Sequence, residues 1–311
     1  MRRSRVGILV GRERSFPDAL VAEVNGRSAG VTAEYATVDL TFVGEPVDYA
    51  VLVDRISHDV TCYQPYLKYA ALTGTHVVNN TAWRIADDKM LDTALAASLG
   101  IAVPKTVLLP SKTYGDDVTA ESLRNLHYPL SWEKMVRELG FPMYLKPHWG
   151  GGWRDVYRVQ SIEELFRVYD RTGRLTMIAQ ESIEWTQYVR CIVIGREHVL
   201  PALWDPRLGH FERYVGAART MQPLSAELLD RVVTQARSLC RALGYDMNTV
   251  EFAIRDGVPY AIDMMNSAPD FDITSLGESH FRWTVERMAD LVIALAKEPS
   301  RPRTSAADLF E

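Results

Sequence analysis

The residues best suited to do chemistry lie near the end of the chain, in the segment TVEFAIRDGVPYAIDMMN (249–266). Glu251 and Asp263 stand on either side of the turn Asp256-Gly257, and Asn266 follows closely. Two carboxylates beside an amide would form an all-oxygen site. Such a site suits Mg²⁺, which favours one or two carboxylates together with phosphate oxygens. The other interpretation is two solvated acids on an exposed sheet face, where charged residues ordinarily stand.

Whether Glu251 and Asp263 share a face depends on the turn between them, because strand side chains alternate between faces. A two-residue Asp-Gly turn pairs positions whose numbers sum to an odd value and would separate the two acids. A three-residue loop with a bulge at Gly257 would keep them on one face. We predict the bulged loop.

A second candidate site is the stretch FPMYLKPHWGGGWRDVYRV (141–159), where an apolar run ends at Lys146 and three glycines follow. Glycines between two strands form either an ordinary hairpin turn or a flap whose backbone amides approach an anion. The lysine precedes the glycines, so the phosphate-loop string Gly-x-x-x-x-Gly-Lys-Ser/Thr is absent. The dinucleotide fingerprint Gly-x-Gly-x-x-Gly is also missing after the first strand. On its own, Lys146 fits equally a strand-end lysine that reaches solvent.

The apolar pattern predicts the elements that must position these residues. Residues 1–80 alternate strand and helix, as in a small doubly wound α/β domain. Ser161 and Glu164 form a capping-box pattern at the start of the helix predicted over 161–173. Further helices are predicted over 87–100, 132–140, 226–243 and about 282–297, strands over 104–110 and 175–183, hairpins over 188–204 and 249–266, and a loose tail over 299–311.

Composition excludes several classes of protein. The 311 residues carry a formal net charge of −5, so no global basic field favours nucleic acid or an anionic membrane. Cys62, Cys191 and Cys240 are far apart, which suggests neither a disulfide framework nor a thiolate zinc site. The apolar runs are too short for a signal peptide or a membrane span. We therefore expect a soluble cytoplasmic protein without nucleic-acid or membrane partners, and a homodimer stays open.

Taken together, these segments resemble the ATP-grasp superfamily of ATP-dependent carboxylate–amine ligases. The motifs follow the family order from about residue 5 to 297: Asp87-Asp88-Lys89 at a helix start, YLKP with the glycine loop, QESI (180–183), VRCIVIG with Arg190, and the acidic hairpin. The likeness is greater to glutathione synthetase, D-alanine–D-alanine ligase and ribosomal-protein glutamate ligases than to the carboxylases.

The resemblance implies an α/β (α+β) ATP-grasp fold whose N-terminal doubly wound domain precedes two α+β subdomains that clasp ATP. The implied parts are an N-terminal pre-ATP-grasp domain (1–86), a central subdomain with the glycine flap (87–183) and a C-terminal subdomain with the metal site (184–311). It also implies an ADP-forming ligase that works through an acyl-phosphate. The expected substrates are a small-molecule or peptide carboxylate and an amine.

The resemblance also implies residue roles. Lys146 and Arg190 would be catalytic, with Arg190 facing the γ-phosphate or the acyl-phosphate. Glu251, Asp263 and Asn266 would hold one or two Mg²⁺ ions, with Mn²⁺ as an alternative metal. The implied ATP-binding residues are two phosphate lysines, the flap glycines, the hinge and a ribose candidate: Lys89, Lys146, Gly150, Gly151, Gly152, Gln180, Glu181, Ser182, Ile183 and Gln187.

Three departures from the family pattern stand out. The relatives carry Glu-x-Asn for the second metal position, whereas this chain has Asp263-Met-Met-Asn266, a spacing that breaks strand alternation. The relatives often place Asp or Glu after the hinge to bind the ribose. Here the nearest residues are Gln187 and Tyr188, with Glu184 as an alternative. D-Alanine ligases carry Arg two residues before the first metal carboxylate. This chain has Thr249 there, which argues against that activity.

Substrate contacts are expected beyond the carboxyl ends of the N-terminal strands, where open α/β sheets bind ligands. Arg12, Arg55 and His58 lie there, and Arg207 and Arg213 lie in the lid-like segment 204–214. Each could fix an anionic substrate group, or be an ordinary surface charge or local cap.

Two other functions fit the same pattern: an ATP-dependent phosphotransferase on the same fold, and a nucleotide-binding regulatory protein without turnover. Lys89, Lys146, Glu251 and Asp263 are all intact, which favours an enzyme. The sequence names neither the carboxylate nor the amine.

Overall fold

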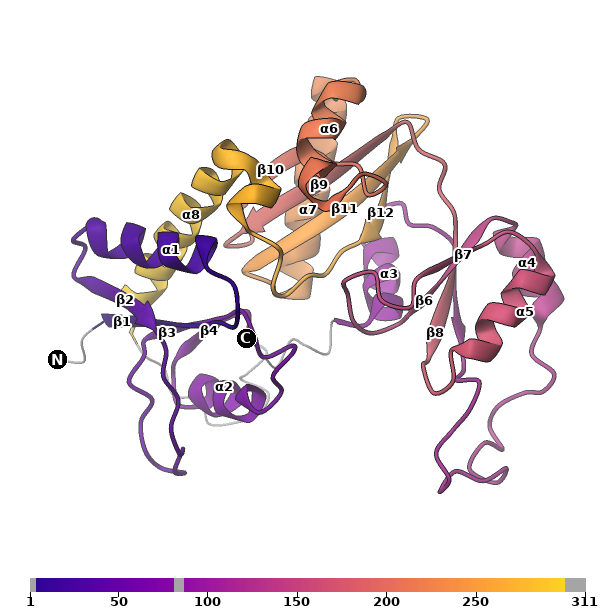
Figure 1. Ribbon diagram of the computed structural model, residues 1–311, viewed down its shortest axis with the longest axis horizontal. Helices are drawn as coiled ribbons and strands as arrows, with labels where there is room; N and C mark the ends of the chain where they lie inside the picture. The colour runs from indigo at the N-terminus through magenta and orange to yellow at the C-terminus, as the bar shows by residue number, and fades with distance from the viewer. Residues whose placement is uncertain (1–3, 81–86, 300–311) are drawn as a thin grey trace.

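The computed structural model describes residues 4–80 and 87–299, which form three four-stranded sheets one after another along the chain (Figure 1). The first sheet is parallel, in the order β2-β1-β3-β4. Its strands are β1 (Ser4–Leu9), β2 (Val31–Tyr35), β3 (Val51–Asp54) and β4 (His76–Val78), and its helices are α1 (Ser15–Gly26) and α2 (Tyr63–Leu72). The predicted doubly wound N-terminal fold is confirmed.

The central sheet is antiparallel, in the order β5-β8-β6-β7. Its strands are β5 (Thr106–Leu109), β6 (Met143–Pro147), β7 (Tyr157–Val159) and β8 (Met177–Glu181), and α4 (Trp132–Leu139) and α5 (Ile162–Arg171) join them in one apolar core. The Ser161 hydroxyl caps α5 by accepting the Glu164 N–H. The Glu164 carboxylate accepts the N–H of Gln160 instead of that of Ser161, so the capping box is displaced by one residue.

The third sheet is antiparallel, in the order β10-β9-β11-β12. Its strands are β9 (Gln187–Ile194), β10 (His198–Leu203), β11 (Met247–Arg255) and β12 (Val258–Asp263). Helix α7 (Ala226–Leu243) covers one face, as the sequence predicts. A short 3-10 helix, η2 (His210–Glu212), and α6 (Arg213–Thr220) follow β10.

Two helices connect these sheets. Helix α3 (Lys89–Ser98) contributes Ala96 to the core that α7 forms with the third sheet. Helix α8 (Ile273–Lys297) runs back beside α1 and shares its core with the first sheet (Figure 1). The sequence predicted a start near residue 282, but α8 begins at Ile273. Gly277, at φ 73° and ψ 160°, is not helical and separates a short first turn from the rest of the helix. The domain limits at 86 and 183 stay a prediction, and the predicted loose tail lies outside the described residues from position 300 on.

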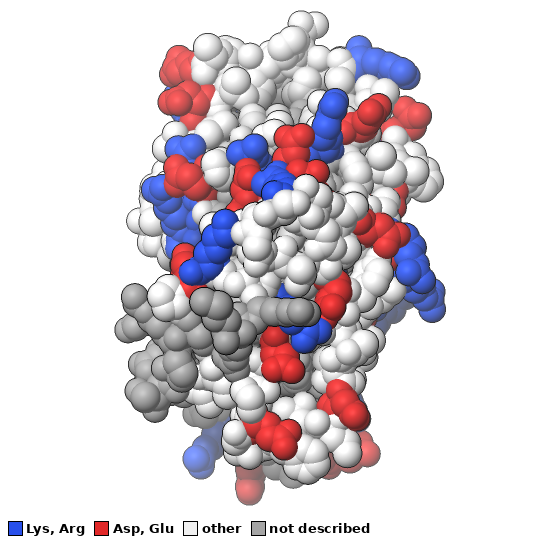
Figure 2. Space-filling view, turned by 90° about the vertical axis from the view of Figure 1, so that its left-hand side faces the viewer, with Lys and Arg blue, Asp and Glu red and all other residues white. Residues whose placement is uncertain are grey.

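Basic and acidic side chains are interspersed on the face shown in Figure 2, so neither positive nor negative charge dominates there. This mixture agrees with the net charge of −5 and offers no extended basic patch on that face. No helix in the described residues is both long and apolar enough to cross a bilayer.

Candidate active site

The hairpin that carries the two acids differs from the prediction. Arg255 pairs with Val258 across a two-residue turn, in which Asp256 and Gly257 have φ of 52° and 72°. Positive φ at both positions is typical of a type I′ turn, so the predicted three-residue loop is wrong. The register shifts one step further along, because Phe252 pairs with Ala261 but Glu251 pairs with Asp263.

Ile262 is the extra residue of that bulge. The turn alone would have separated the acids, and the bulge restores them to opposite positions on one face. Across the sheet, Arg190 on β9 pairs with Glu251 on β11, which pairs with Asp263 on β12. A cation and two carboxylates therefore form one row across three adjacent strands.

Glu251 lies in the middle of this row, with its side chain only 13% exposed. The Tyr188 hydroxyl donates to it at 2.8 Å, and the Arg190 Nε lies 3.6 Å from its other oxygen. Burial raises the pKa of Glu251 to about 7, the Arg190 charge opposes that rise, and the Asp263 carboxylate adds to it. Two crowded carboxylates in a buried site are the donor set that a divalent cation would stabilise.

The donor set suits a hard cation that brings its own ligands. No group of three or more His, Cys, Asp or Glu side chains in the described part of the chain could hold a metal ion. Mg²⁺ needs no such cage, because it binds through one or two carboxylates plus phosphate oxygens and waters. The Glu251–Asp263 pair therefore fits Mg²⁺ better than it fits a metal held by protein ligands alone.

Two lysines face this pair from other elements. Lys146 on β6 is 8% exposed, and burial lowers its pKa while the charge of Asp263 opposes that change. Its Nζ lies 3.4 Å from the carbonyl of Ile262, the bulge residue. Lys89 is the first residue of α3, and its Nζ donates to the carbonyl of Gly150 in the glycine loop. A buried cation beside the acids and a second cation at the flap favour binding of a polyanion.

The glycine loop joins β6 to β7 and is anchored at its base to the start of α3. The Asp88 carboxylate lies 3.1 Å from Nδ1 of His148, and the Lys89 N–H donates to the His148 carbonyl at 2.8 Å. Gly150 and Gly152 have φ of 96° and 70°, and a Cβ at any of the three glycines would meet nothing within 4 Å. Backbone conformation, and not packing within the chain, therefore favours glycine there.

The cleft between the central and third sheets encloses about 920 Å³, including space open to solvent. Its walls include ten of the predicted site residues: Lys89, Lys146, Gly150, Gly151, Gly152, Gln180, Glu181, Ile183, Glu251 and Asp263. They also include four aromatic residues, of which only Tyr188 was predicted to contact ATP, as a ribose candidate: Tyr144, Trp153, Trp185 and Tyr188.

Four predicted site residues either do not line the cleft or already have a hydrogen-bond or ion-pair partner within the chain. Ser182 is not among the lining residues. The Gln187 amide donates to the carbonyls of Gln222 and Pro223, at 2.7 and 3.1 Å. Asn266 donates its backbone N–H to Asn248, which fixes the loop after β12. The Glu181 carboxylate lines the cleft but also pairs with Arg255 at 3.0 Å.

The predicted substrate residues separate into two groups. Arg55 is buried and donates to Glu13 at 2.6 Å and to the Pro269 carbonyl at 2.6 Å, so its guanidinium joins segments of the fold. Arg12 is exposed, and His58 is half-exposed 3.7 Å from Asp59; neither lines the cleft.

The two lid arginines lie nearer to the cleft. Arg207 pairs with Asp205 and stacks 3.9 Å from the ring centroid of Trp185, a cleft residue. Arg213 lies 5.2 Å from the ring centroid of Trp204 and donates to the Leu208 carbonyl at 3.3 Å.

One acidic residue near the site was missed. Asp92 on α3 is 1% exposed, and burial raises its pKa to about 9, with the charge of Asp263 adding to the rise. Its Oδ1 has no hydrogen-bond partner in the described residues. The signal was present in the sequence, because Asp92 lies four positions before buried Ala96 and so on the core-facing side of the helix.

Two known proteins with similar sequences are a carbamoyl phosphate synthase large chain and a D-alanine–D-alanine ligase. No protein-family model matches the chain. The carbamoyl phosphate synthase large chain of Deinococcus deserti is 25% identical over 266 residues, which is 77% of this chain and 24% of that protein. The D-alanine–D-alanine ligase of Ralstonia nicotianae is 28% identical over 192 residues, 56% of this chain and 57% of that protein. The chain thus spans about a quarter and just over half of these two relatives.

Solved structures match along nearly the whole chain. A RimK domain ATP-grasp protein of Sphaerobacter thermophilus superposes with a TM-score of 0.63 at 19% identity, over 93% of this chain and 99% of that one. The D-alanine–D-alanine ligase of Bacillus anthracis gives 0.61 at 16% identity, over 94% and 97%. The ATP-grasp ligase PsnB, solved with precursor peptide PsnA2 and AMPPNP, gives 0.62 at 16% identity, over 96% and 98%.

The fold and the cleft therefore define the class of this protein: it has the ATP-grasp fold. The fold that the order of sequence motifs predicted is confirmed, with the glycine loop on the central sheet and the acid pair on the third. At these identities the likeness shows the fold alone, and the activity is argued separately from the site.

Proposed function

We propose that this chain is an ATP- and Mg²⁺-dependent ligase that joins a carboxylate to an amine through an acyl-phosphate and releases ADP. One observation carries the proposal. Glu251 and Asp263 line a cleft whose other walls supply Lys89, Lys146 and three glycines, and buried Arg190 pairs with Glu251. Acids that suit Mg²⁺, opposed by cations and unobstructed amides, match a nucleotide triphosphate held by its metal.

ATP would lie with its base near the hinge residues Gln180–Ile183 and its phosphates toward the acids. Lys89 and Lys146 would neutralise phosphate oxygens, and the amides of the glycine loop would close over the β- and γ-phosphates. Gln187 is not included as a ribose ligand, because its amide donates to two carbonyls outside the cleft. Two ribose candidates remain: Tyr188, which lines the cleft, and Glu184, which is exposed just beyond the hinge.

Glu251 and Asp263 would hold one or two Mg²⁺ ions, with Asn266 as a further candidate and Mn²⁺ as an alternative. The metal would neutralise phosphate charge when bound. Solved neighbours agree with this cofactor set: the Bacillus anthracis ligase is described in complex with ATP, and PsnB with Mg and ADP.

The chemistry follows from the site's charges. A free carboxylate is a poor electrophile, and transfer of the γ-phosphoryl group gives it a leaving group. The amine lone pair then attacks the acyl carbon, and the bond to phosphate breaks with its electrons leaving on inorganic phosphate. Arg190 lies 3.6 Å from Glu251 and would stabilise charge on the acyl-phosphate and on the oxyanion formed during attack.

The proposal specifies the two substrates only as a carboxylate and an amine. Relatives by sequence or fold include D-alanine–D-alanine ligase and a peptide ligase, but their substrates do not transfer at these identities. Thr249 accepts a hydrogen bond from Arg190 at 3.2 Å, where D-alanine ligases carry an arginine. That difference disfavours D-alanine ligation.

The proposal is tested by trapping the acyl-phosphate. The protein is incubated with MgATP, hydroxylamine and a panel of amino acids, N-acetyl amino acids and dipeptides as carboxylates. A ligase gives carboxylate-dependent ADP and a hydroxamate. Glu251→Ala should abolish both, and the matched exposed variant Glu121→Ala should leave both unchanged. A phosphorylated product without hydroxamate would show a phosphotransferase, and MgATP binding without any ADP release would show a regulatory protein.

A further inference from the structure

A second polar cluster lies beyond the acid pair, where β9, the segment after β10 and the loop after β12 meet. Three buried polar atoms in it make no hydrogen bond to any described residue: Nε of Arg190, the hydroxyl of Tyr214 and Oδ2 of Asp270. Buried polar groups without a hydrogen bond are rare in folded proteins, because leaving them unpaired is costly. The cluster therefore keeps donor and acceptor capacity that its close contacts do not satisfy with aligned hydrogen bonds.

The cluster adjoins the acid pair through Arg190. The charges of Tyr214, Glu251, Asp270 and Asp263 each act on its guanidinium, and together they raise the pKa of Arg190 although burial opposes that rise. The Arg190 and Arg213 guanidinium groups each lie 5.2 Å from the Trp204 ring centroid. Arg213 forms no ion pair with any residue that the structure describes. One side of the cluster is therefore cationic and continuous with the proposed phosphate site.

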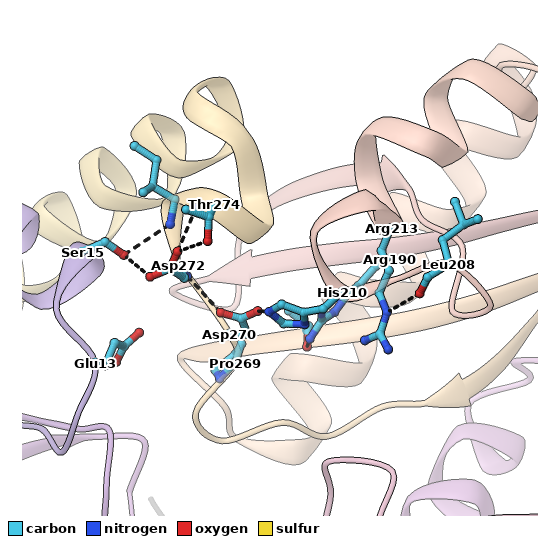
Figure 3. Close-up of polar contacts among 12 residues, drawn as sticks. Glu13, Ser15, Arg190, Leu208, His210, Arg213, Pro269, Asp270, Asp272 and Thr274 are labelled. Carbon is cyan, nitrogen blue, oxygen red and sulfur yellow. Dashed lines mark hydrogen bonds and ion pairs between the residues drawn. The ribbon is translucent and has the colours of Figure 1, made fainter.

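Asp270 forms the opposite side and is held rigidly from the N-terminal domain. Its Oδ1 accepts the Asp272 N–H at 3.0 Å. Ser15 donates to Asp272 at 2.8 Å, and Arg55 donates to the Pro269 carbonyl at 2.6 Å. Figure 3 shows Asp272 between Ser15 and Asp270, with Asp270 pointing toward His210. The sequence predicted that Arg55 would bind substrate, and here it positions the loop instead.

His210 comes from η2 in the lid-like segment, and its Nε2 lies 3.2 Å from Oδ2 of Asp270 (Figure 3). The contact is close but not aligned as a hydrogen bond, as is common for catalytic pairs without substrate. An ionised Asp270 can only accept a hydrogen bond, so in the neutral imidazole the proton lies on Nε2 and Nδ1 is the acceptor. The His210 side chain is 49% exposed, so an incoming amine can reach it.

We propose that His210, oriented by Asp270, is the general base that deprotonates the amine substrate. The inference rests on the ligase function proposed above. An ammonium group would give one proton to the imidazole Nδ1, and the freed lone pair would attack the acyl carbon of the acyl-phosphate. Phosphate leaves with the electrons of the C–O bond, and the amide nitrogen loses its second proton to that phosphate. The imidazolium then returns its proton to solvent.

The test compares two nucleophiles on one acyl-phosphate. Hydroxylamine is uncharged near neutral pH and needs no base, whereas the amino acids and polyamines of an amine panel are ammonium ions. With the carboxylate that gives most hydroxamate, His210→Ala should lower amide formation about 100-fold and leave hydroxamate formation within about 2-fold, since general bases contribute 10²–10⁴ in rate. Added imidazole should restore part of the amide rate. Asp270→Asn should lower amide formation selectively, because it removes the charge that orients His210.

The controls separate this inference from the ligase proposal. His198 is an exposed histidine on β10, and His198→Ala should change neither product. Equal loss of amide and hydroxamate in His210→Ala would overturn the base assignment and leave the ligase intact. Hydroxamate without amide from any amine in wild-type protein would also count against the assignment. No hydroxamate in wild-type protein would remove the ligase proposal and this inference with it.

Discussion

At the scale of single residues, burial and the charge of Arg190 act in opposite directions on the pKa of Glu251. Glu251 is enclosed by Tyr188, Arg190 and Asp263, and the arginine only partly offsets the cost of burying a carboxylate next to another. Its pKa is raised from 4.5 to about 7. A group tuned in this way is typical of functional sites, because a stable fold alone would not place two acids side by side in a cleft.

This raised pKa predicts a pH-dependent stability. Glu251 contributes stability that is fully present below pH 4.5 and is lost as pH rises through about 7, because the folded state holds a proton that the unfolded state has released. We expect Glu251→Gln to have about wild-type stability at pH 5. At pH 8.5 it should exceed wild type by on the order of 3 kcal/mol.

Urea unfolding in EDTA at both pH values measures this difference. Glu121→Gln, at an exposed position, is the control and should follow wild type at both. If Glu251→Gln differs from wild type by the same amount at pH 5 and pH 8.5, Glu251 does not have the raised pKa.

At the scale of elements, the start of α3 determines where the glycine flap sits. The Asp88 carboxylate accepts the N–H groups of Met90 and Leu91, at 2.8 and 3.3 Å, and so caps the helix. The same side chain contacts His148 at the base of the flap, and the next residue is Lys89. One carboxylate thus fixes both a helix terminus and the neighbouring phosphate-facing loop.

We therefore predict that Asp88→Ala loosens the flap. It should lower the unfolding free energy by about 1 kcal/mol through the lost cap. It should also speed trypsin cleavage after Arg154, an exposed flap residue, severalfold. Asp88→Asn keeps a capping oxygen and should change stability less. Cleavage after exposed Arg124 provides the internal reference in a mass-spectrometric time course. Unchanged cleavage after Arg154 in both variants would show that the flap does not depend on this anchor.

At the scale of the whole molecule, the N-terminal domain and the third sheet are joined by α8 and by one buried arginine. The Arg55 side chain is 3% exposed and pairs with Glu13. Its guanidinium also lies 5.2 Å from the ring centroids of Phe16 and Phe271, on two different parts of the chain. The loop that carries Asp270 is therefore positioned by contacts that span most of the sequence.

Removing this connection should be costly. We expect Arg55→Ala to lower the unfolding free energy by about 3–5 kcal/mol, because it leaves Glu13 without its partner and opens space between two aromatic rings. Arg27→Ala is the matched control. Its side chain is 27% exposed in its pairs with Glu23 and Asp290, and exposed pairs contribute about 0–1 kcal/mol. Urea midpoints measure both variants, and equal losses would mean that Arg55 is not a special link.

The sequence alone determined the order of parts and predicted residues that the structure brings to one cleft. Lys89, Lys146, the three glycines, Glu251 and Asp263 were identified from motif order, and all line the cleft. Helix α7 was predicted with its observed limits, because apolar spacing and a Ser225 cap are local signals. Such features depend on neighbours a few residues apart, so they are readable without the fold.

Tertiary structure decided what depends on distant partners. The bulge at Ile262, and not the turn, sets Glu251 opposite Asp263, because register is fixed by pairing along the whole hairpin and not by the turn type alone. Arg55 was expected at a substrate, yet Glu13 and Pro269 occupy its guanidinium. His210 and Asp270 lie 60 residues apart and meet only because β9, β11 and β12 form one sheet between them. Neither residue belongs to a motif, and only the folded chain brings their side chains within 3.2 Å of each other.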